Sequence, residues 1–310
     1  MSVSFEEIGQ RLKAYRMGKG ASAEEVAKKI GISRAAVYRI ENGEMVKIET
    51  LERLAQVLET SIASLLGVGV EYYSSAISYF ERMRQIEEQS EQVVAHFPPM
   101  SYLLTTEKYP FYLKKVLLEA LPQDRADGGG AGSEIDQVIT TLNERKTARD
   151  RRRLSVVNFV TVPEIERWLK LGVVGRFDLP DHELLSRRLA AREEVEHLAA
   201  LIESEPMGVQ IALIEETLPN VAFQLFRTSG RTTLGLSPFR LGGELPNIRT
   251  GVAMLTSDEE PVRLYERFAD DLWRRARKGS EAAALVRSVL SRSGAVSQSK
   301  AIPRQRGTRS

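Results

Sequence analysis

Residues 23–42, AEEVAKKIGISRAAVYRIEN, decide the fold of the first part of this chain. Within this stretch Gly31 stands where a tight bend between two helices requires a residue that tolerates a positive φ. Ser33 offers a hydroxyl that can cap the helix after the bend. Apolar side chains recur at helical spacing on both sides of the glycine, at Val26, Ile30, Ile32, Val37 and Ile40. Two short helices joined in this way are typical of a helix-turn-helix, in which the first helix braces the second against a DNA major groove.

Three further short helices are expected around this pair, within residues 1–68. A helical stripe of apolar residues begins at Phe5 and ends before Gly18. Ser22 with Glu25 forms a capping-box pair at the start of the second helix, and Asn42-Gly43 is a turn signal that ends the third. The helices are expected over about 5–17, 22–30, 33–41, 48–58 and 62–66. Together they would form one compact all-helical domain.

This module resembles the Cro/cI-type DNA-binding domain of phage repressors and of bacterial regulators of the xenobiotic-response-element class. The resemblance rests on four segments in the expected order: IGQRLKAYR, SAEEVAKKIGIS, VYRIENG and LERLAQVLE. It implies a five-helix, lambda-repressor-like fold for 1–68 and a transcriptional regulator whose partner is double-stranded DNA. It further implies a homodimer on a palindromic operator, with repression as the default mode of action.

The resemblance also implies which side chains meet DNA. The recognition helix would begin at Ser33 and expose Arg34 and Arg39, which suit bidentate bonds to guanine O6 and N7. Ala35 could only touch a thymine methyl group or leave room for one. For Tyr38, contact with DNA and packing on the module's own surface both remain open. The two arginines could instead be solvated charges paired with Glu41 or Glu44.

Three more positions match those that hold backbone phosphates in the family, namely Ser22, Ala23 and Asn42. Many relatives carry Gln at position 23, so Ala23 lacks the side-chain anchor that is usual there. Lys28, Lys29 and Lys47 could supply positive charge in its place. The residues predicted to contact DNA are Ser22, Ala23, Ser33, Arg34, Ala35, Tyr38, Arg39 and Asn42.

The amino-acid composition limits the classes of protein to which this chain can belong. The chain has 310 residues and a formal net charge of +2, so a DNA-binding surface must come from local segregation of charge. There are no cysteines, which excludes disulfides, cysteine zinc sites and thiol catalysis. The first residues, MSVSFEEIGQ, lack a signal-peptide pattern, and no apolar run approaches about 18 residues. A soluble cytoplasmic protein without membrane contact is therefore expected.

Residues 69–100 are predicted to form a helical connector that begins at about Glu71 and is broken at Pro98-Pro99. Tyr73, Ile77 and Phe80 begin a moderate apolar stripe that needs a packing partner. Two alternatives remain open. The helix could pair with a second copy and supply a two-fold axis, or it could dock on its own C-terminal domain.

Residues 101–291 are predicted to form an α+β domain with a mostly antiparallel sheet, serving dimerisation or effector binding. Helices are expected over about 105–120, 135–153, 163–172, 181–203 and 259–291. Strands are expected at 155–162, 209–215, 221–227, 232–236 and 249–256, the second to fourth as an antiparallel meander. Residues 292–310 carry basic side chains and no acid, which predicts a disordered basic tail.

This half resembles the C-terminal domain, of uncharacterised biochemistry, that follows the same helix-turn-helix in many bacterial regulators. No catalytic, cofactor or metal signature is found, since the three histidines, His96, His182 and His197, lack metal-binding spacing. The chain is therefore not expected to be an enzyme. An unknown ligand or protein could bind the C-terminal domain. The alternative function is an antitoxin-like or scaffold protein whose C-terminal domain mainly captures a partner protein.

Overall fold

The computed structural model of the chain describes residues 4–121, 130–218, 222–242 and 245–299. Its N-terminal domain has the predicted helices, which are α1 (Phe5–Gly18), α2 (Ala23–Ile30), α3 (Arg34–Glu41), α4 (Ile48–Val57) and α5 (Ile62–Leu66). Gly31 ends α2 in the left-handed conformation, with φ of 70°, as the bend requires. Ser22 and Glu25 form the complete capping box at the start of α2. The predicted helical domain is confirmed.

A mixed sheet forms the centre of the rest of the chain. Its strands are β1 (Val70–Tyr73), β2 (Gln92–His96), β3 (Ser155–Thr161), β4 (Val209–Ile214), β5 (Ala222–Thr228), β6 (Arg231–Ser237) and β7 (Ala253–Thr256). Their order across the described sheet is β1-β7-β6-β5-β2-β3-β4. The β2–β3 and β3–β4 pairs are parallel, and the other neighbours are antiparallel. The predicted α+β domain with a mostly antiparallel sheet is confirmed.

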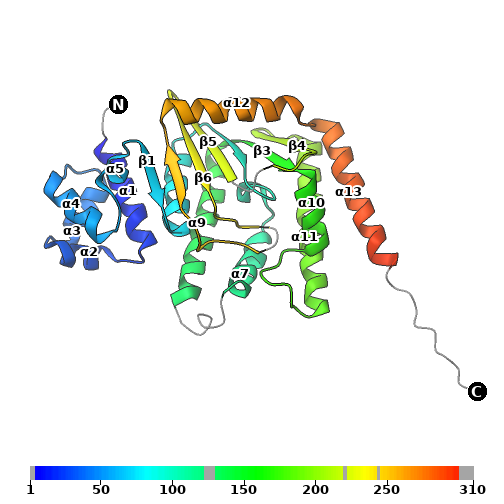
Figure 1. Cartoon of the computed structure of the whole chain (residues 1–310), viewed down its shortest axis with the longest axis horizontal. Helices are drawn as coiled ribbons and strands as arrows, with labels where there is room; N and C mark the ends of the chain where they lie inside the picture. The colour runs from blue at the N-terminus through cyan, green and yellow to red at the C-terminus, as the bar shows by residue number, and fades with distance from the viewer. Residues whose placement is uncertain (1–3, 122–129, 219–221, 243–244, 300–310) are drawn as a thin grey trace, which may run out of the picture.

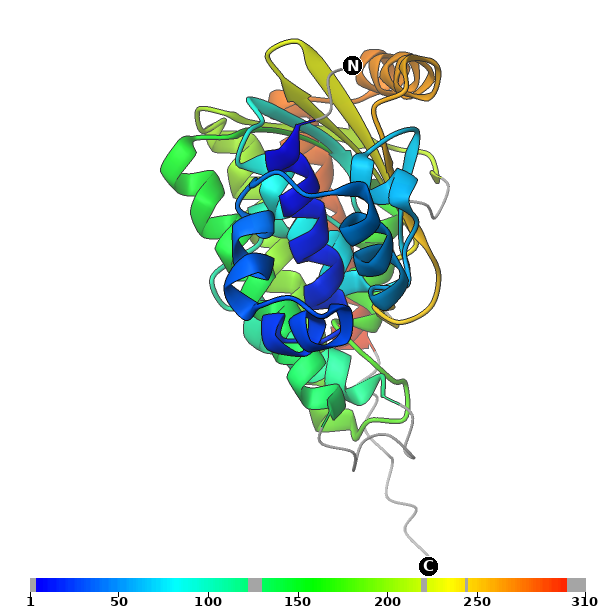
Figure 2. The same cartoon turned by 90° about the vertical axis from the view of Figure 1, so that its left-hand side faces the viewer.

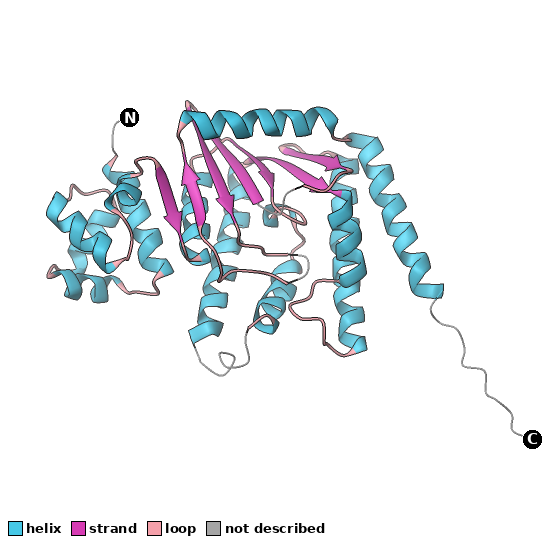
Figure 3. Ribbon diagram, in the orientation of Figure 1, coloured by secondary structure: helices cyan, strands magenta, loops and turns pink. Residues whose placement is uncertain are grey.

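Helices cover both faces of this sheet (Figures 1 and 3). On one face α12 packs on Val94, Phe159 and Phe223. The opposite face holds the larger core, to which the remaining helices contribute. The elements beyond the N-terminal domain are α6 (Ala76–Glu87), the 3-10 helix η1 (Tyr102–Leu104), α7 (Tyr109–Glu119), α9 (Gly130–Arg152), α10 (Val162–Leu171), α11 (Asp181–Ser204), α12 (Glu259–Arg275) and α13 (Gly279–Ser299).

The prediction of a helical connector over 69–100 is wrong at both ends. Residues 70–73 form the edge strand β1, in which Glu71 and Tyr73 are buried and Tyr72 is exposed, a period of two that marks a strand. Residues 92–96 form β2 in the middle of the sheet. Only α6 lies between them, and every residue of α6 except Arg84 is buried. This helix therefore has no face for a second copy, and of the two alternatives the structure shows docking on the chain's own C-terminal part.

The predicted meander is only half present. β5 and β6 form the expected hairpin, but β4 pairs in parallel with β3 at the far edge of the sheet. The reason is that β3, α10, α11 and β4 form a crossover unit, and β2 inserts next to β5. Leu185 and Leu189 of α11 are exposed.

The predicted last helix is two helices. Ala276 has an extended backbone, and Arg277 exchanges backbone hydrogen bonds of 2.9 Å with Leu213. Gly279, with φ of 55°, begins α13. Residues 292–299, predicted as disordered, continue α13, and the rest of the predicted tail lies outside the described residues.

A buried ion cluster joins the N-terminal domain to the sheet. The Glu71 carboxylate on β1 accepts from Arg11 Nε of α1 at 2.6 Å and from Arg82 Nε of α6 at 3.1 Å. The Tyr73 hydroxyl donates to the same carboxylate at 2.6 Å. Next to the cluster, the rings of Tyr15 and Tyr73 stack with centroids 4.8 Å apart. Because α5 leads directly into β1, the helix-turn-helix domain is fixed to the body by covalent, ionic and aromatic contacts together.

This cluster should make the stability of the fold depend on pH. Burial alone would raise the pKa of Glu71, but Arg82, Arg11 and the Tyr73 hydroxyl outweigh it and lower the pKa to about 2. A lowered pKa means that the ionised carboxylate stabilises the fold above pH 4.5, its ordinary value, and loses this effect as the pH falls through about 2. We expect the ionised Glu71 carboxylate to contribute about 3 kcal/mol to the free energy of unfolding at neutral pH. Urea unfolding at pH 7 and pH 3 should show that the difference in unfolding free energy between wild type and Glu71→Gln is about 2 kcal/mol smaller at pH 3. An equal gap at both pH values would contradict this assignment.

Candidate nucleic-acid interface

The start of α3 is an open helix end suited to an anion. Ser33 caps it, its hydroxyl accepting from the Ala36 amide at 3.1 Å. The first turn carries no acidic residue. The amides of Arg34 and Ala35 have no acceptor within the helix, because the first N–H groups of any helix lack one. Together with the positive end of the helix dipole, they form a site where a phosphate can bind.

The predicted contact residues of α3 lie together on its outer face. Arg34, Ala35, Tyr38 and Arg39 are all exposed, while Val37 and Ile40 of the same helix point into the core. The Arg34 guanidinium lies over the Tyr38 ring, 5.5 Å from its centroid. Arg39 Nε lies 3.0 Å from a Glu44 oxygen, although 64% of the Arg39 side chain is exposed. This is the ion pair that the sequence left as an alternative, and its exposure makes it weak.

Glu41, the other partner considered for the arginines, is held elsewhere. Arg16 of α1 binds its carboxylate in a two-bond pair, at 2.5 Å through Nε and 2.9 Å through Nη2. Arg16 also donates to the Ala21 carbonyl at 3.0 Å. No local pattern in the sequence indicates this pair, because Arg16 lies 25 residues from Glu41 along the chain. The pair fixes the end of α3 against α1 and leaves the outer face free.

A close backbone approach seats α3 on the same helix. A methyl group at Gly9 of α1 would lie 2.4 Å from the Ile40 carbonyl oxygen and 2.5 Å from that of Glu41. Only a residue without a side chain allows this approach. The position of α3 thus depends on Gly9.

Gly9→Ala should therefore lower the free energy of unfolding by about 1–3 kcal/mol, the usual cost of overpacking, because backbone atoms must move. If α3 contacts DNA, affinity for DNA should fall as well, since α3 is displaced. Gly132→Ala is the matched control, because a methyl group there meets nothing within 4 Å. That change should be neutral or slightly stabilising in urea unfolding. Equal stability of the two variants would show that the approach of α1 to α3 is not tight.

The start of α2 is less suited to a phosphate than predicted. Ser22 is committed to its own cap, with its amide 2.7 Å and its hydroxyl 2.9 Å from the Glu25 carboxylate. Ala23 is only 2% exposed, so no more than its amide can reach DNA. Glu24 and Glu25 place two carboxylates at the same helix end. Asn42 is exposed at the end of α3, and the lysines considered as substitutes, Lys28, Lys29 and Lys47, are exposed as well.

The interface lies at one end of the molecule. In Figure 2 the blue helices of the N-terminal domain face the viewer, and the later parts of the chain lie behind them. The body therefore leaves this end of the molecule open.

The N-terminal domain matches a known family. Residues 12–65 fit the family model described as helix-turn-helix. Residues 12–65 are a helix-turn-helix domain. The resemblance of this part of the sequence to the helix-turn-helix regulators is thus confirmed. SinR of Bacillus licheniformis, named as an HTH-type transcriptional regulator, is 39% identical over 62 residues, which are 19% of this chain and 56% of SinR.

A second relative matches beyond this domain. It is PF1851 of Pyrococcus furiosus, which is named as an HTH-type transcriptional regulatory protein. It is 27% identical to this chain over 155 residues. The match covers 48% of this chain and 43% of PF1851, and it is longer than the helix-turn-helix domain. The chain thus spans about half the length of these curated relatives. The solved structure of TrmBL2, an archaeal chromatin protein, aligns with 74% of this chain and 60% of its own at 10% identity, with a TM-score of 0.31, too low to indicate a shared fold.

Two further findings concern the described residues alone. None of their helices is both long and apolar enough to cross a membrane. Their His, Cys, Asp and Glu side chains form no group of three that could hold a metal ion.

Proposed function

We propose that this chain is a sequence-specific DNA-binding transcriptional regulator that reads the major groove with α3. The observation that carries the proposal is the outer face of α3, where Arg34, Tyr38 and Arg39 are exposed next to an acid-free helix start. The Arg16–Glu41 pair holds the inner side of the same helix. The names of SinR and PF1851 support the same function.

In the proposed complex each contact has a defined role. Arg34 and Arg39 read guanine edges, and Arg39 must leave Glu44 to do so. Ala35 packs on a thymine methyl group. Ser33 and the first amides of α3 bind a backbone phosphate, while Ser22, Ala23 and Asn42 contribute smaller phosphate contacts. The Tyr38 ring positions Arg34 through the cation–π contact with its guanidinium group.

The regulator is further proposed to act as a dimer on a palindromic operator and to repress by blocking polymerase. One helix-turn-helix domain on a chain with net charge +2 makes too few contacts for tight specific binding. A second copy doubles these contacts, and a two-fold axis matches a palindrome. Because α6 is buried, the two copies must meet through another surface.

Sedimentation of the full chain with a duplex selected from a random pool tests this function. We expect sedimentation to show two chains per duplex. Footprinting of the same duplex should show protected half-sites about one helical turn apart. A complex of one chain per duplex would overturn the dimer, and no enrichment of any sequence over the starting pool would overturn specific recognition. Repression is checked by transcription in vitro from a promoter that contains the selected site.

A further inference from the structure

A cavity of about 430 Å³ lies on the α12 face of the sheet. Phe223, Leu236 and Met254 line it from three strands, and Tyr265 and Phe268 line it from α12. This volume falls in the range of sites for small organic molecules, roughly 300–1,000 Å³. Its described walls carry no charged side chain other than the ionisable His96 at the end of β2.

The polar group that distinguishes this cavity is His96. It is only 2% exposed, and its Nδ1 lies 3.2 Å from the Phe159 carbonyl oxygen. Since a carbonyl only accepts, Nδ1 must carry a hydrogen. Nε2 has no hydrogen-bond partner among the described residues.

The protonation of His96 decides what it can bind. Burial lowers the pKa of His96, and the Glu164 carboxylate only partly opposes this effect. The imidazole is then neutral at pH 7, with its hydrogen on Nδ1, so that Nε2 is an acceptor. A buried acceptor without a donor is unfavourable, and a ligand that brings a donor removes this penalty.

The aromatic walls define the rest of the ligand. Phe223 lies with its ring centroid 5.4 Å from that of Tyr265 and 5.6 Å from that of Phe268. Tilted rings at these distances offer faces and edges to a further ring. We propose that this cavity binds a small, uncharged aromatic molecule with one hydroxyl group, which donates its hydrogen bond to His96 Nε2.

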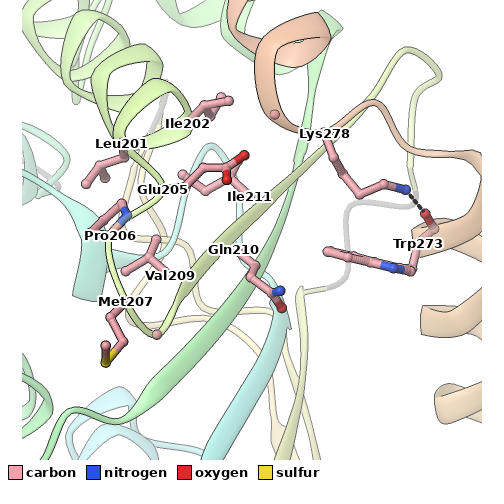
Figure 4. Close-up of a pocket in the computed structure, with 12 residues that line it drawn as sticks. Leu201, Ile202, Glu205, Pro206, Met207, Val209, Gln210, Ile211, Trp273 and Lys278 are labelled. Carbon is pink, nitrogen blue, oxygen red and sulfur yellow. Dashed lines mark hydrogen bonds between the residues drawn. The ribbon is translucent and has the colours of Figure 1, made fainter.

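A second cavity fits a ligand less well. It lies between the turn after α11 and the start of α13 and measures about 330 Å³ (Figure 4). Lys278 lines it, but its ammonium group donates to the Trp273 carbonyl at 2.6 Å and lies over the Trp273 ring. The Lys278 ammonium group is thus already engaged by Trp273 and is less available to a ligand.

The proposed site lies close to the junction with the helix-turn-helix domain. Met254 of β7 pairs with Tyr72 of β1, and the Tyr72 carbonyl accepts from the Tyr15 hydroxyl of α1 at 2.8 Å. The cavity is thus one strand away from the strand that anchors that domain. Ligand binding itself does not depend on the proposed DNA contacts and is measured without DNA.

Calorimetric titration of the full chain with 1-naphthol and with 1-methoxynaphthalene tests the proposal. Both probes fill the cavity, but only the naphthol can donate to His96. We expect 1-naphthol to bind at least roughly tenfold more tightly, the ratio that one buried hydrogen bond provides. Equal affinity of the two probes, or no binding of 1-naphthol, would overturn the proposal.

Variants locate the binding. His96→Phe should remove the preference for 1-naphthol, while thermal melting reports whether this variant folds. Leu236→Trp, at a partly exposed wall position, keeps His96 but fills the cavity, and should weaken both probes at least tenfold. Leu264→Trp, on the exposed side of α12, is the matched control and should change neither. If Leu236→Trp binds both probes like wild type, the site is not this cavity.

Discussion

Replacing Glu71 with Gln should lower the free energy of unfolding at pH 7 by about 3–5 kcal/mol, the usual cost of removing one partner from a buried ion pair. Glu71 is 6% exposed and is the carboxylate that both Arg11 and Arg82 share. Its loss leaves the buried Arg82 without an ion-pair partner among the described residues, and Arg11 with Glu7 alone. Because the cluster links α1, β1 and α6, the helix-turn-helix domain should also lose its fixed position on the body.

Urea unfolding followed by circular dichroism measures this change. Glu59→Gln is the matched control, because it removes the same charge from an exposed ion pair with Lys19. That control should leave the urea midpoint nearly unchanged, because an exposed ion pair is screened by solvent. If the two variants unfold at the same urea concentration, the cluster does not hold the domains together.

Replacing Arg34 with Ala should weaken binding to the selected duplex by about 1–3 kcal/mol, or roughly 5- to 150-fold. The guanidinium group is exposed on α3 and lies over Tyr38, so it can turn toward a base without breaking a buried contact. The change should not affect folding, because the side chain adds little to the core.

Anisotropy titration with a labelled duplex measures this effect. Arg263→Ala removes the same charge from the exposed side of α12, far along the chain, and controls for net charge. The affinity of this variant should stay within about twofold of wild type, because Arg263 lies on α12 and has no part in the proposed contact face of α3. A similar loss in both variants would mean that Arg34 acts only through bulk charge.

The helix-turn-helix could be predicted from sequence because its signals are local. Gly31, the Ser22–Glu25 capping box and the cap at Ser33 each act within a few residues. The segment after it could not, because β1 and β2 are strands only by virtue of distant partners, β7 for the first and β3 and β5 for the second. Glu71 in particular is of a residue type that is usually exposed to solvent, and its partner Arg11 lies 60 residues away along the chain.

The candidate site was predicted in part. The exposed face of α3 is where the pattern of apolar residues implied, and whether it meets DNA stays a prediction. The burial of Ala23 and the Arg16–Glu41 pair depend on how α1 packs, which no local signal reveals. His96 had no recognisable spacing with other histidines, because its significance comes from the Phe159 carbonyl and an aromatic cavity assembled from separate elements.

The central claim is that α3 reads base sequence, and parallel selection from a random duplex pool tests it most directly. Wild type and Arg34→Ala are each taken through the same rounds, and the enriched sequences are compared position by position. We predict that Arg34→Ala loses the preference for guanine at one position in each half-site and keeps the others. An unchanged preference at every position, together with unchanged affinity, would contradict the assignment of α3 as the recognition helix.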